Sequence, residues 1–197
     1  MATQPKPYLT PEEYLAFERE ADVKHEYYAG EIFAFAGASR QHNLIAGNVF
    51  AGLHAQLRKR PCEVYPSDMR VRVSPTGLYT YPDVTVVCEE ARFDDENKDT
   101  LLNPMVIVEV LSPSTEGYDR GGKFEQYRKL ESVQEYVVIA QDRVHVERWG
   151  REENNQWLLS ETDNVEDVIT LPSIGCRLAV ADLYEKVEFE SNAGNHP

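Results

Sequence analysis

The stretch PMVIVEVLSPS, residues 104–114, decides the fold predicted for this chain. It is an almost unbroken apolar run between Pro104 and a Ser-Pro-Ser segment, which is typical of a strand buried on both faces. Glu109 is the one charged residue in the run. A carboxylate is rarely buried in a strand unless it is paired or binds a metal, so Glu109 is the first candidate site residue.

A second strand is predicted over residues 79–87, where YTYPDVTVV places Asp83 directly after Pro82. If the two strands are neighbours, Asp83 and Glu109 meet at one end of a sheet. Two carboxylates suit Mg²⁺ or Mn²⁺, which combine a few protein oxygens with water and substrate phosphate. The alternative for Asp83 is an ordinary aspartate at a turn or strand end.

A helix is predicted from Asp119, as its N-cap, to about residue 130. Lys123 and Tyr127 follow at intervals of four residues, so the three side chains share one helix face. A lysine there can stabilise the charge that develops during phosphodiester hydrolysis. The alternative is a buried ion pair between Lys123 and Glu109, with Tyr127 used for packing.

The surrounding chain supplies further helices and strands. Thr10-Pro11-Glu12-Glu13 is typical of a helix start, and Ala29-Gly30 predicts a hairpin between aromatic-rich runs. Ser39 is the expected N-cap of a longer helix, and a strand follows over residues 62–73. Further strands are expected over residues 134–140 and 143–148. The central order of helix, three strands, helix and strand predicts an α/β or α+β fold with a mixed sheet flanked by helices. The apolar stripe of the longer helix comprises Ile45, Val49, Leu53 and Leu57.

Length and composition favour one globular domain, expected over residues 9–190, with flexible ends at residues 1–8 and 191–197. No run approaches the roughly 20 apolar residues of a membrane span, and the N-terminus does not resemble a signal peptide, which favours a cytoplasmic location. The three cysteines are widely spaced and are expected to be reduced. The net charge of −14 argues against a protein that coats nucleic acid non-specifically.

Six short motifs occur in this chain, namely Tyr81-Pro82-Asp83-Val84, the stretch from Val108 to Ser114, Asp119-x-x-x-Lys123-x-x-x-Tyr127, Glu135-Tyr136, Gly37-x-Ser39-x-x-His42 and Thr10-x-Glu12-Glu13-Tyr14. Together they resemble the Uma-type restriction endonucleases of the PD-(D/E)XK nuclease superfamily. The resemblance covers about residues 9–184, and its departure is Leu111, where the superfamily's Glu-x-Lys pattern would place lysine.

The resemblance implies a restriction-endonuclease-like fold with an N-terminal helix and hairpin extension. It also implies a homodimeric endonuclease that uses Mg²⁺ or Mn²⁺ to hydrolyse DNA. Asp83 and Glu109 would be catalytic metal ligands, and the catalytic lysine would have moved to Lys123. The accessory candidates are His42, Asp119, Tyr127 and Glu31.

A second function remains open, in which the fold is a catalytically inactive module that binds nucleic acid or protein. Leu111 and the acidic net charge favour it. Arg70 and Arg72 alternate on a predicted strand, where they either contact phosphate or are ordinary exposed charges. An unrelated hydrolase is set aside because the sequence has no Gly-x-Ser-x-Gly motif and no zinc-spaced histidine pair.

Overall fold

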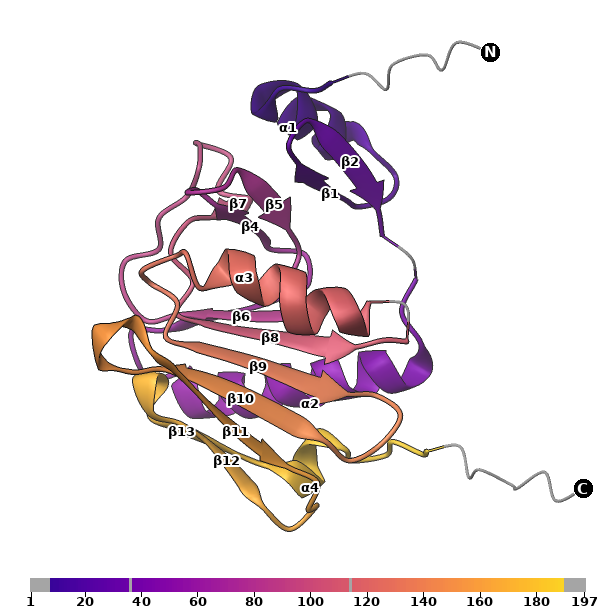
Figure 1. Cartoon of the computed structure of the whole chain (residues 1–197), viewed down its shortest axis with the longest axis vertical. Helices are drawn as coiled ribbons and strands as arrows, with labels where there is room; N and C mark the ends of the chain where they lie inside the picture. Colours follow the sequence, from indigo (N-terminus) through magenta and orange to yellow (C-terminus); the bar gives the residue numbers. More distant parts are fainter. Residues whose placement is uncertain (1–7, 36, 114, 190–197) are drawn as a thin grey trace, which may run out of the picture.

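The computed structural model describes residues 8–35, 37–113 and 115–189 and folds them into a mixed α+β structure (Figure 1). The flexible ends predicted at residues 1–8 and 191–197 lie outside the described residues, apart from Tyr8, as does Ser114 of the deciding stretch. The division into a single domain over residues 9–190 stays a prediction. Within the described ranges, no helix combines the length and apolar character needed to cross a membrane.

The larger of two mixed sheets has six strands, and Glu109 lies near its middle. Neighbouring strands are antiparallel except β8 and β9, which run parallel. All six residues of β8 are buried, which confirms the strand predicted from the deciding stretch. In spatial order the strands are β11 (Trp157–Thr162), β10 (Val146–Arg151), β9 (Glu135–Ala140), β8 (Val106–Leu111), β6 (Val84–Val87) and β3 (Glu63–Pro66).

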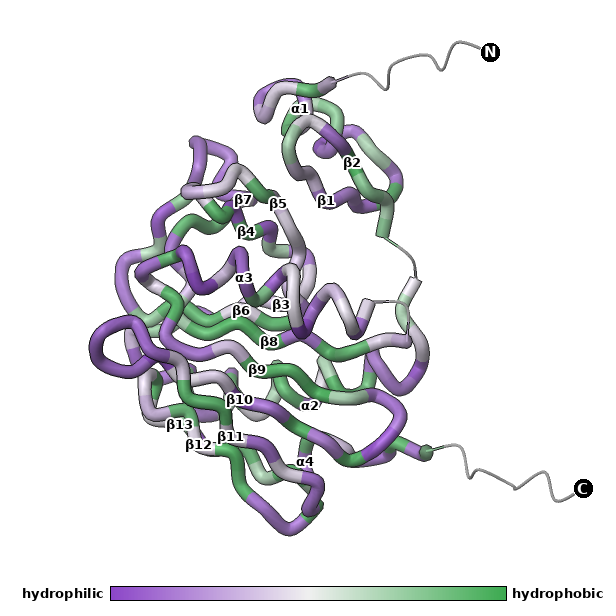
Figure 2. Tube along the Cα trace, in the orientation of Figure 1, coloured by the Kyte–Doolittle hydropathy of each residue, from purple (hydrophilic) through white to green (hydrophobic). Residues whose placement is uncertain are grey.

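Helices cover both faces of this sheet (Figure 1). On one face lies α2 (Arg40–Leu57), with Ser39 as its N-cap, as predicted. On the other face the π-helix η1 (Tyr118–Lys123) continues into α3 (Phe124–Tyr127). Figure 2 shows the hydrophobic colouring concentrated on the strands between these helices. The α2 residues that pack against the sheet, each fully buried, are Ile45, Val49, Leu53 and Leu57.

The smaller sheet packs beside the larger one and contains the N-terminal hairpin (Figure 1). Its strands are β2 (Glu31–Ala34), β1 (His25–Tyr28), β5 (Leu78–Thr80), β4 (Arg70–Val73) and β7 (Thr100–Leu101). Helix α1 (Pro11–Glu20) joins this sheet through a cluster that includes Tyr14, Tyr27 and Tyr79. The remaining elements are β12 (Val168–Leu171), β13 (Cys176–Ala179), α4 (Val180–Leu183) and the 3₁₀ helices η2 (Glu153–Asn155) and η3 (Pro172–Ile174).

The predicted order of helix, three strands, helix and strand is found in the larger sheet as α2, β3, β6, β8, η1 with α3, and β9. Three predicted strands were wrong in extent. The strand predicted over residues 143–148 is β10, which runs from Val146 to Arg151. Residues 62–73 form β3 in the larger sheet and β4 in the smaller one. Residues 79–87 likewise divide into β5 and β6, and the chain passes between the sheets at Tyr81-Pro82-Asp83, where Pro82 cannot donate a ladder hydrogen bond.

The helix predicted over residues 119–130 begins earlier and ends earlier, at Tyr127. Asp119 is not its N-cap. It lies inside the π-helix, which is entered at Gly117 without a side-chain cap. Two consecutive glycines, Gly121 and Gly122, occupy the middle of this wide turn, where low helix propensity weakens the preference for a regular α-helix.

The expectation of three reduced cysteines was wrong. Cys62 and Cys88 form a disulfide. They lie next to the ends of β3 and β6, whose register pairs Glu63 with Val87 and therefore brings Cys62 opposite Cys88. Cys176 is free and buried. The pairing depends on the register of two strands, which residue spacing alone does not give.

The start of α1 allows a first test of the fold. Thr10 Oγ1 accepts a hydrogen bond from the Glu13 backbone N–H at 3.2 Å, and Glu13 Oε2 accepts one from the Thr10 backbone N–H at 2.8 Å. Replacing Thr10 with alanine should lower the free energy of unfolding by about 1 kcal/mol, because one of the first helical N–H groups loses its acceptor. Urea denaturation measures the change. Thr10→Ser, which keeps the hydroxyl, should retain most of the stability, and equal loss in both variants would contradict the capping role.

Candidate functional site

Asp83 stands where the chain passes from the smaller sheet to the larger one, directly before β6. Its Oδ2 accepts a hydrogen bond of 2.7 Å from the backbone N–H of Val110 on β8. His42 Nε2, from the first turn of α2, lies 3.3 Å from the same oxygen. Because β6 and β8 are antiparallel neighbours with Val84 opposite Val108, Asp83 lies at the level of Glu109 and Val110.

Glu109 projects from the middle of β8 on the face covered by η1 and α3. This face also carries Ile107 and Leu111, since alternate strand residues point the same way. The carboxylate is deeply buried, with a side chain only 4% exposed. Its Oε1 accepts a hydrogen bond of 2.8 Å from the Tyr127 hydroxyl and one of 3.1 Å from Lys123 Nζ.

Lys123 is surrounded by three carboxylates. Its Nζ lies 3.1 Å from Glu109 Oε1, 3.2 Å from Asp119 Oδ1 and 3.4 Å from Glu26 Oε1. Asp119 and Lys123 belong to the same π-helix, while Glu26 comes from β1 of the smaller sheet. The Tyr136 hydroxyl donates to the Asp119 carbonyl oxygen at 2.8 Å, which ties the π-helix to β9.

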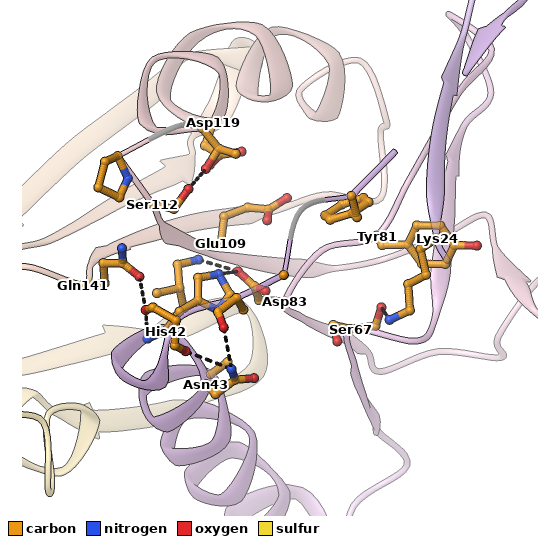
Figure 3. Close-up of a pocket in the computed structure, with 18 of the residues that line it drawn as sticks. Lys24, His42, Asn43, Ser67, Tyr81, Asp83, Glu109, Ser112, Asp119 and Gln141 are labelled. Carbon is orange, nitrogen blue, oxygen red and sulfur yellow. Dashed lines mark hydrogen bonds and ion pairs between the residues drawn. The ribbon is translucent and has the colours of Figure 1, made fainter. Parts of the chain in front are cut away.

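Asp83, Glu109, Asp119 and Lys123 line a pocket of about 590 Å³ (Figure 3). Its walls come from distant parts of the chain: the hairpin contributes Lys24 and Phe35, the start of α2 contributes His42, and the loop after β9 contributes Gln141. Figure 3 places Asp83 and Glu109 between the helix that carries His42 and the helix that carries Asp119. The pocket therefore forms where both sheets and the helices on both faces of the larger sheet meet.

The acidic residues change the proton affinity of the site. Burial raises the pKa of Glu109 well above its usual range, and the negative charges of Asp119 and Asp83 add to the effect, while Lys123 and the Tyr127 hydroxyl oppose it. The pKa of Lys123 is also raised: burial lowers it, but Glu109, Glu26 and Asp119 together raise it more. The pKa values of Glu109 and Lys123 can both be raised because three carboxylates share one ammonium group. Lys123 therefore keeps its proton whichever of the three is ionised.

The pKa of His42, on the opposite side of the pocket, is also shifted. Burial disfavours its protonation, but the hydrogen bond and negative charge of Asp83 more than offset this, and its pKa is raised above the usual value. Nδ1 is buried and has no hydrogen-bond partner among the described residues. His42 is thus placed to hold a proton at Nε2 against Asp83.

The structure brings together six of the seven candidate residues, namely Asp83, Glu109, Lys123, His42, Asp119 and Tyr127. Glu31 is not among the residues that line the pocket and is exposed at the start of β2. Glu26 from the other strand of that hairpin supplies the additional carboxylate, which the sequence reasoning missed. The one available signal in the sequence was that Glu26 is a charged residue next to Tyr27 and Tyr28 in an aromatic-rich predicted strand.

Neither Arg70 nor Arg72 is a freely exposed charge. Arg70 is buried, lies 3.2 Å from Asp99 and stacks near the rings of Tyr14 and Tyr81. Arg72 is paired with Asp94. Both arginines therefore stabilise the smaller sheet, and neither lines the pocket.

Comparison with known proteins identifies the family. The Uma2 family model, described as "Putative restriction endonuclease", matches residues 11–181. The chain belongs to the Uma2 family. The matched segment contains every residue of the pocket cluster described above. The family expected from the sequence motifs is thereby confirmed.

Two uncharacterised proteins of Synechocystis are similar to this Uma2 chain. One is 36% identical over 185 residues, covering 94% of this chain and 96% of the relative; the other is 40% identical over 153 residues, covering 78% and 86%. A crystal structure of a "putative nuclease belonging to DUF820" from Anabaena variabilis superposes with a TM-score of 0.74 at 19% identity. It covers 91% of this chain and 99% of that protein, and it shows that the two share a fold.

Proposed function

We propose that this Uma2 protein is a metal-dependent nuclease that hydrolyses phosphodiester bonds of DNA on a restriction-endonuclease-like core. The observation that carries the proposal is the meeting of Asp83 and Glu109 from neighbouring strands in one pocket, with Lys123 Nζ 3.1 Å from Glu109. Family membership and the shared fold support it. The expected homodimer stays a prediction, since two related sites are needed only where both strands of a duplex are cut.

The donor set fits a hard divalent cation such as Mg²⁺ or Mn²⁺. Within the described hydrogen bonds, Asp83 is engaged through Oδ2 and Glu109 through Oε1, which leaves a second oxygen on each. Three carboxylates, those of Glu109, Glu26 and Asp119, surround the single ammonium group of Lys123, so this part of the site has more acidic than basic groups. When bound, such an ion supplies Lewis-acid activation of water and of a phosphate oxygen.

The chain's own residues would orient the two carboxylates and stabilise the charge that develops on the phosphate. The Val110 N–H and His42 orient Asp83, while the Tyr127 hydroxyl orients Glu109. Lys123 would stabilise the negative charge that develops on the phosphoryl oxygens. Leu111 lies on the same face of β8 as Glu109 and is buried in the core. Lys123 reaches Glu109 from the π-helix that covers this face, so its ammonium group lies on the side of the strand to which a lysine at position 111 would project.

An inactive interaction module is the second candidate function. It is favoured by the complete pairing of Lys123, whose ammonium group has three carboxylates around it before any phosphate enters. Metal binding separates the two candidates, because an interaction module has no need of a cation at Asp83 and Glu109.

Calorimetric titration with Mn²⁺ tests the nuclease proposal. The native protein should bind Mn²⁺, and Asp83→Asn and Glu109→Gln should each weaken binding by at least about 100-fold, because changes outside the direct ligands already cost 10–100-fold. Glu125→Gln, an exposed carboxylate on α3, is the matched control and should bind normally. Native protein that binds no Mn²⁺, or ligand variants that bind as well, would refute the proposal. Mg²⁺-dependent cleavage of DNA, assayed on both single-stranded and duplex substrates, should be lost in the same two variants.

A further inference from the structure

The two carboxylates proposed as metal ligands lie at the base of the pocket and not on an open surface. The side chain of Asp83 is 13% exposed and that of Glu109 only 4%. A scissile phosphate must therefore enter the pocket to reach them. A duplex holds its phosphates on a stiff outer surface, whereas a single strand can turn one phosphate inward because its backbone is flexible.

The pocket has little free positive charge to attract a phosphate backbone. Among the described lining residues, Lys24 and Lys123 are the permanent cations. Lys24 is paired with Asp68, and Lys123 with its three carboxylates. Proteins that bind a duplex mainly through its phosphates use unpaired lysines and arginines. Each contact between such a side chain and a phosphate adds to the salt dependence of binding.

Two exposed aromatic rings lie near Lys123. Phe35 lines the pocket and is 39% exposed. Tyr118, at the start of the π-helix, is 44% exposed and lies beside the pocket without being one of its lining residues. The centre of each ring lies 5.9 Å from Lys123 Nζ, so both are close to the candidate catalytic group. The Tyr118 ring lies against Gly122, where a Cβ atom would come within 2.6 Å of it, so this glycine makes room for the ring.

We propose that the pocket takes single-stranded or locally unpaired DNA, with unpaired bases stacking on Phe35 and Tyr118 while a phosphate reaches Asp83 and Glu109. The proposal rests on the nuclease function above and specifies its substrate. Stacking on aromatic side chains tolerates any base sequence, because every base has a π-face. Cleavage of a single strand needs one active site, so this substrate does not require a dimer.

Binding of fluorescent 30-nucleotide DNA, measured by anisotropy with Ca²⁺ in place of Mg²⁺, tests the substrate class. The single strand should bind at least tenfold more tightly than the same sequence annealed to its complement. Phe35→Ala and Tyr118→Ala should each weaken single-strand binding by about tenfold, within the range for loss of one stacked base. Phe33→Ala is the matched control. Phe33 is similarly exposed, at 48%, but it does not line the pocket, and its ring has no contact with Lys123 among those of the described residues.

The Mn²⁺ titration, repeated on each variant, distinguishes the two proposals. Normal Mn²⁺ binding at Asp83 and Glu109 together with equal or tighter binding of duplex overturns the single-strand proposal and leaves the nuclease proposal standing. Unchanged affinity in Phe35→Ala and Tyr118→Ala overturns the stacking role, and preference for single-stranded RNA overturns the choice of DNA. Absence of Mn²⁺ binding in the native protein overturns both proposals.

Discussion

In the Lys123→Met variant, the free energy of unfolding at neutral pH should fall by about 3–5 kcal/mol, the usual cost of removing one partner from a buried ionic cluster. The variant leaves Glu109, Asp119 and Glu26 close together without the ammonium that lies within 3.4 Å of each. Lowering the pH should reduce the loss, because protonated carboxyl groups no longer repel one another. Urea denaturation at neutral and acidic pH, in metal-free buffer, measures both effects.

Lys129→Met is the matched control for this substitution. Lys129 follows α3 and is 38% exposed, and its partner Glu125 is more exposed still. An exposed pair of this kind contributes little, so the control should change stability by less than about 1 kcal/mol. Equal effects of the two substitutions would show that Lys123 does not hold the acidic cluster together.

The affinity for Mn²⁺ should rise by about tenfold per pH unit until the raised pKa of Glu109 is passed. Below that pKa the carboxyl group must release one proton before it can bind a cation, so binding and proton release are linked. Burial is the main cause of the raised pKa, with Asp119 and Asp83 adding to it. The raised pKa also makes the free energy of unfolding depend on pH. In the metal-free protein, the stability contributed by the Glu109 proton is present at low pH and is lost as the pH rises through the raised pKa.

Calorimetry in two buffers of different ionisation enthalpy measures the proton released at each pH. Asp119→Asn should shift the profile to lower pH, because it removes one of the negative charges that raise the pKa of Glu109. An affinity that does not depend on pH would mean that Glu109 is ionised throughout, contrary to its burial among carboxylates.

The core of the site could be predicted from local patterns. Glu109 was identified because a charge within the apolar run of β8 requires a partner, and Lys123 and Tyr127 followed from their spacing along a helix. The strand, the helix α2 and its buried stripe depend on periodicity and capping, which act over a few residues. The structure brings all of these to the places that the patterns indicated.

The remainder depends on how distant segments pack, which no local pattern records. Glu26 reaches Lys123 because the hairpin joins a second sheet through β5, and that sheet was not predicted at all. The disulfide between Cys62 and Cys88 depends on strand register. Asp119 was assigned to an N-cap because its residue type favours that position, yet the chain uses it inside a π-helix beside Lys123.

The chain passes between the two sheets at Tyr81-Pro82-Asp83, so the shape of the pocket depends on how the two sheets pack against each other. One wall of the pocket, with Phe35, follows the hairpin of the smaller sheet, and Glu26 of the same hairpin contacts Lys123. Asp83 and Glu109 lie at the larger sheet, and Lys123 lies on the π-helix that covers it. Movement of the hairpin away from the larger sheet would open the pocket and remove Glu26, one of the three partners of Lys123, without breaking a strand of the larger sheet. The rest of the smaller sheet cannot follow without loss of core packing, because Val71, Val73, Leu78 and Leu101 belong to the same apolar cluster as Ile107 and Leu111. A ligand that contacts both the hairpin and the larger sheet would therefore hold them together and stabilise the closed pocket.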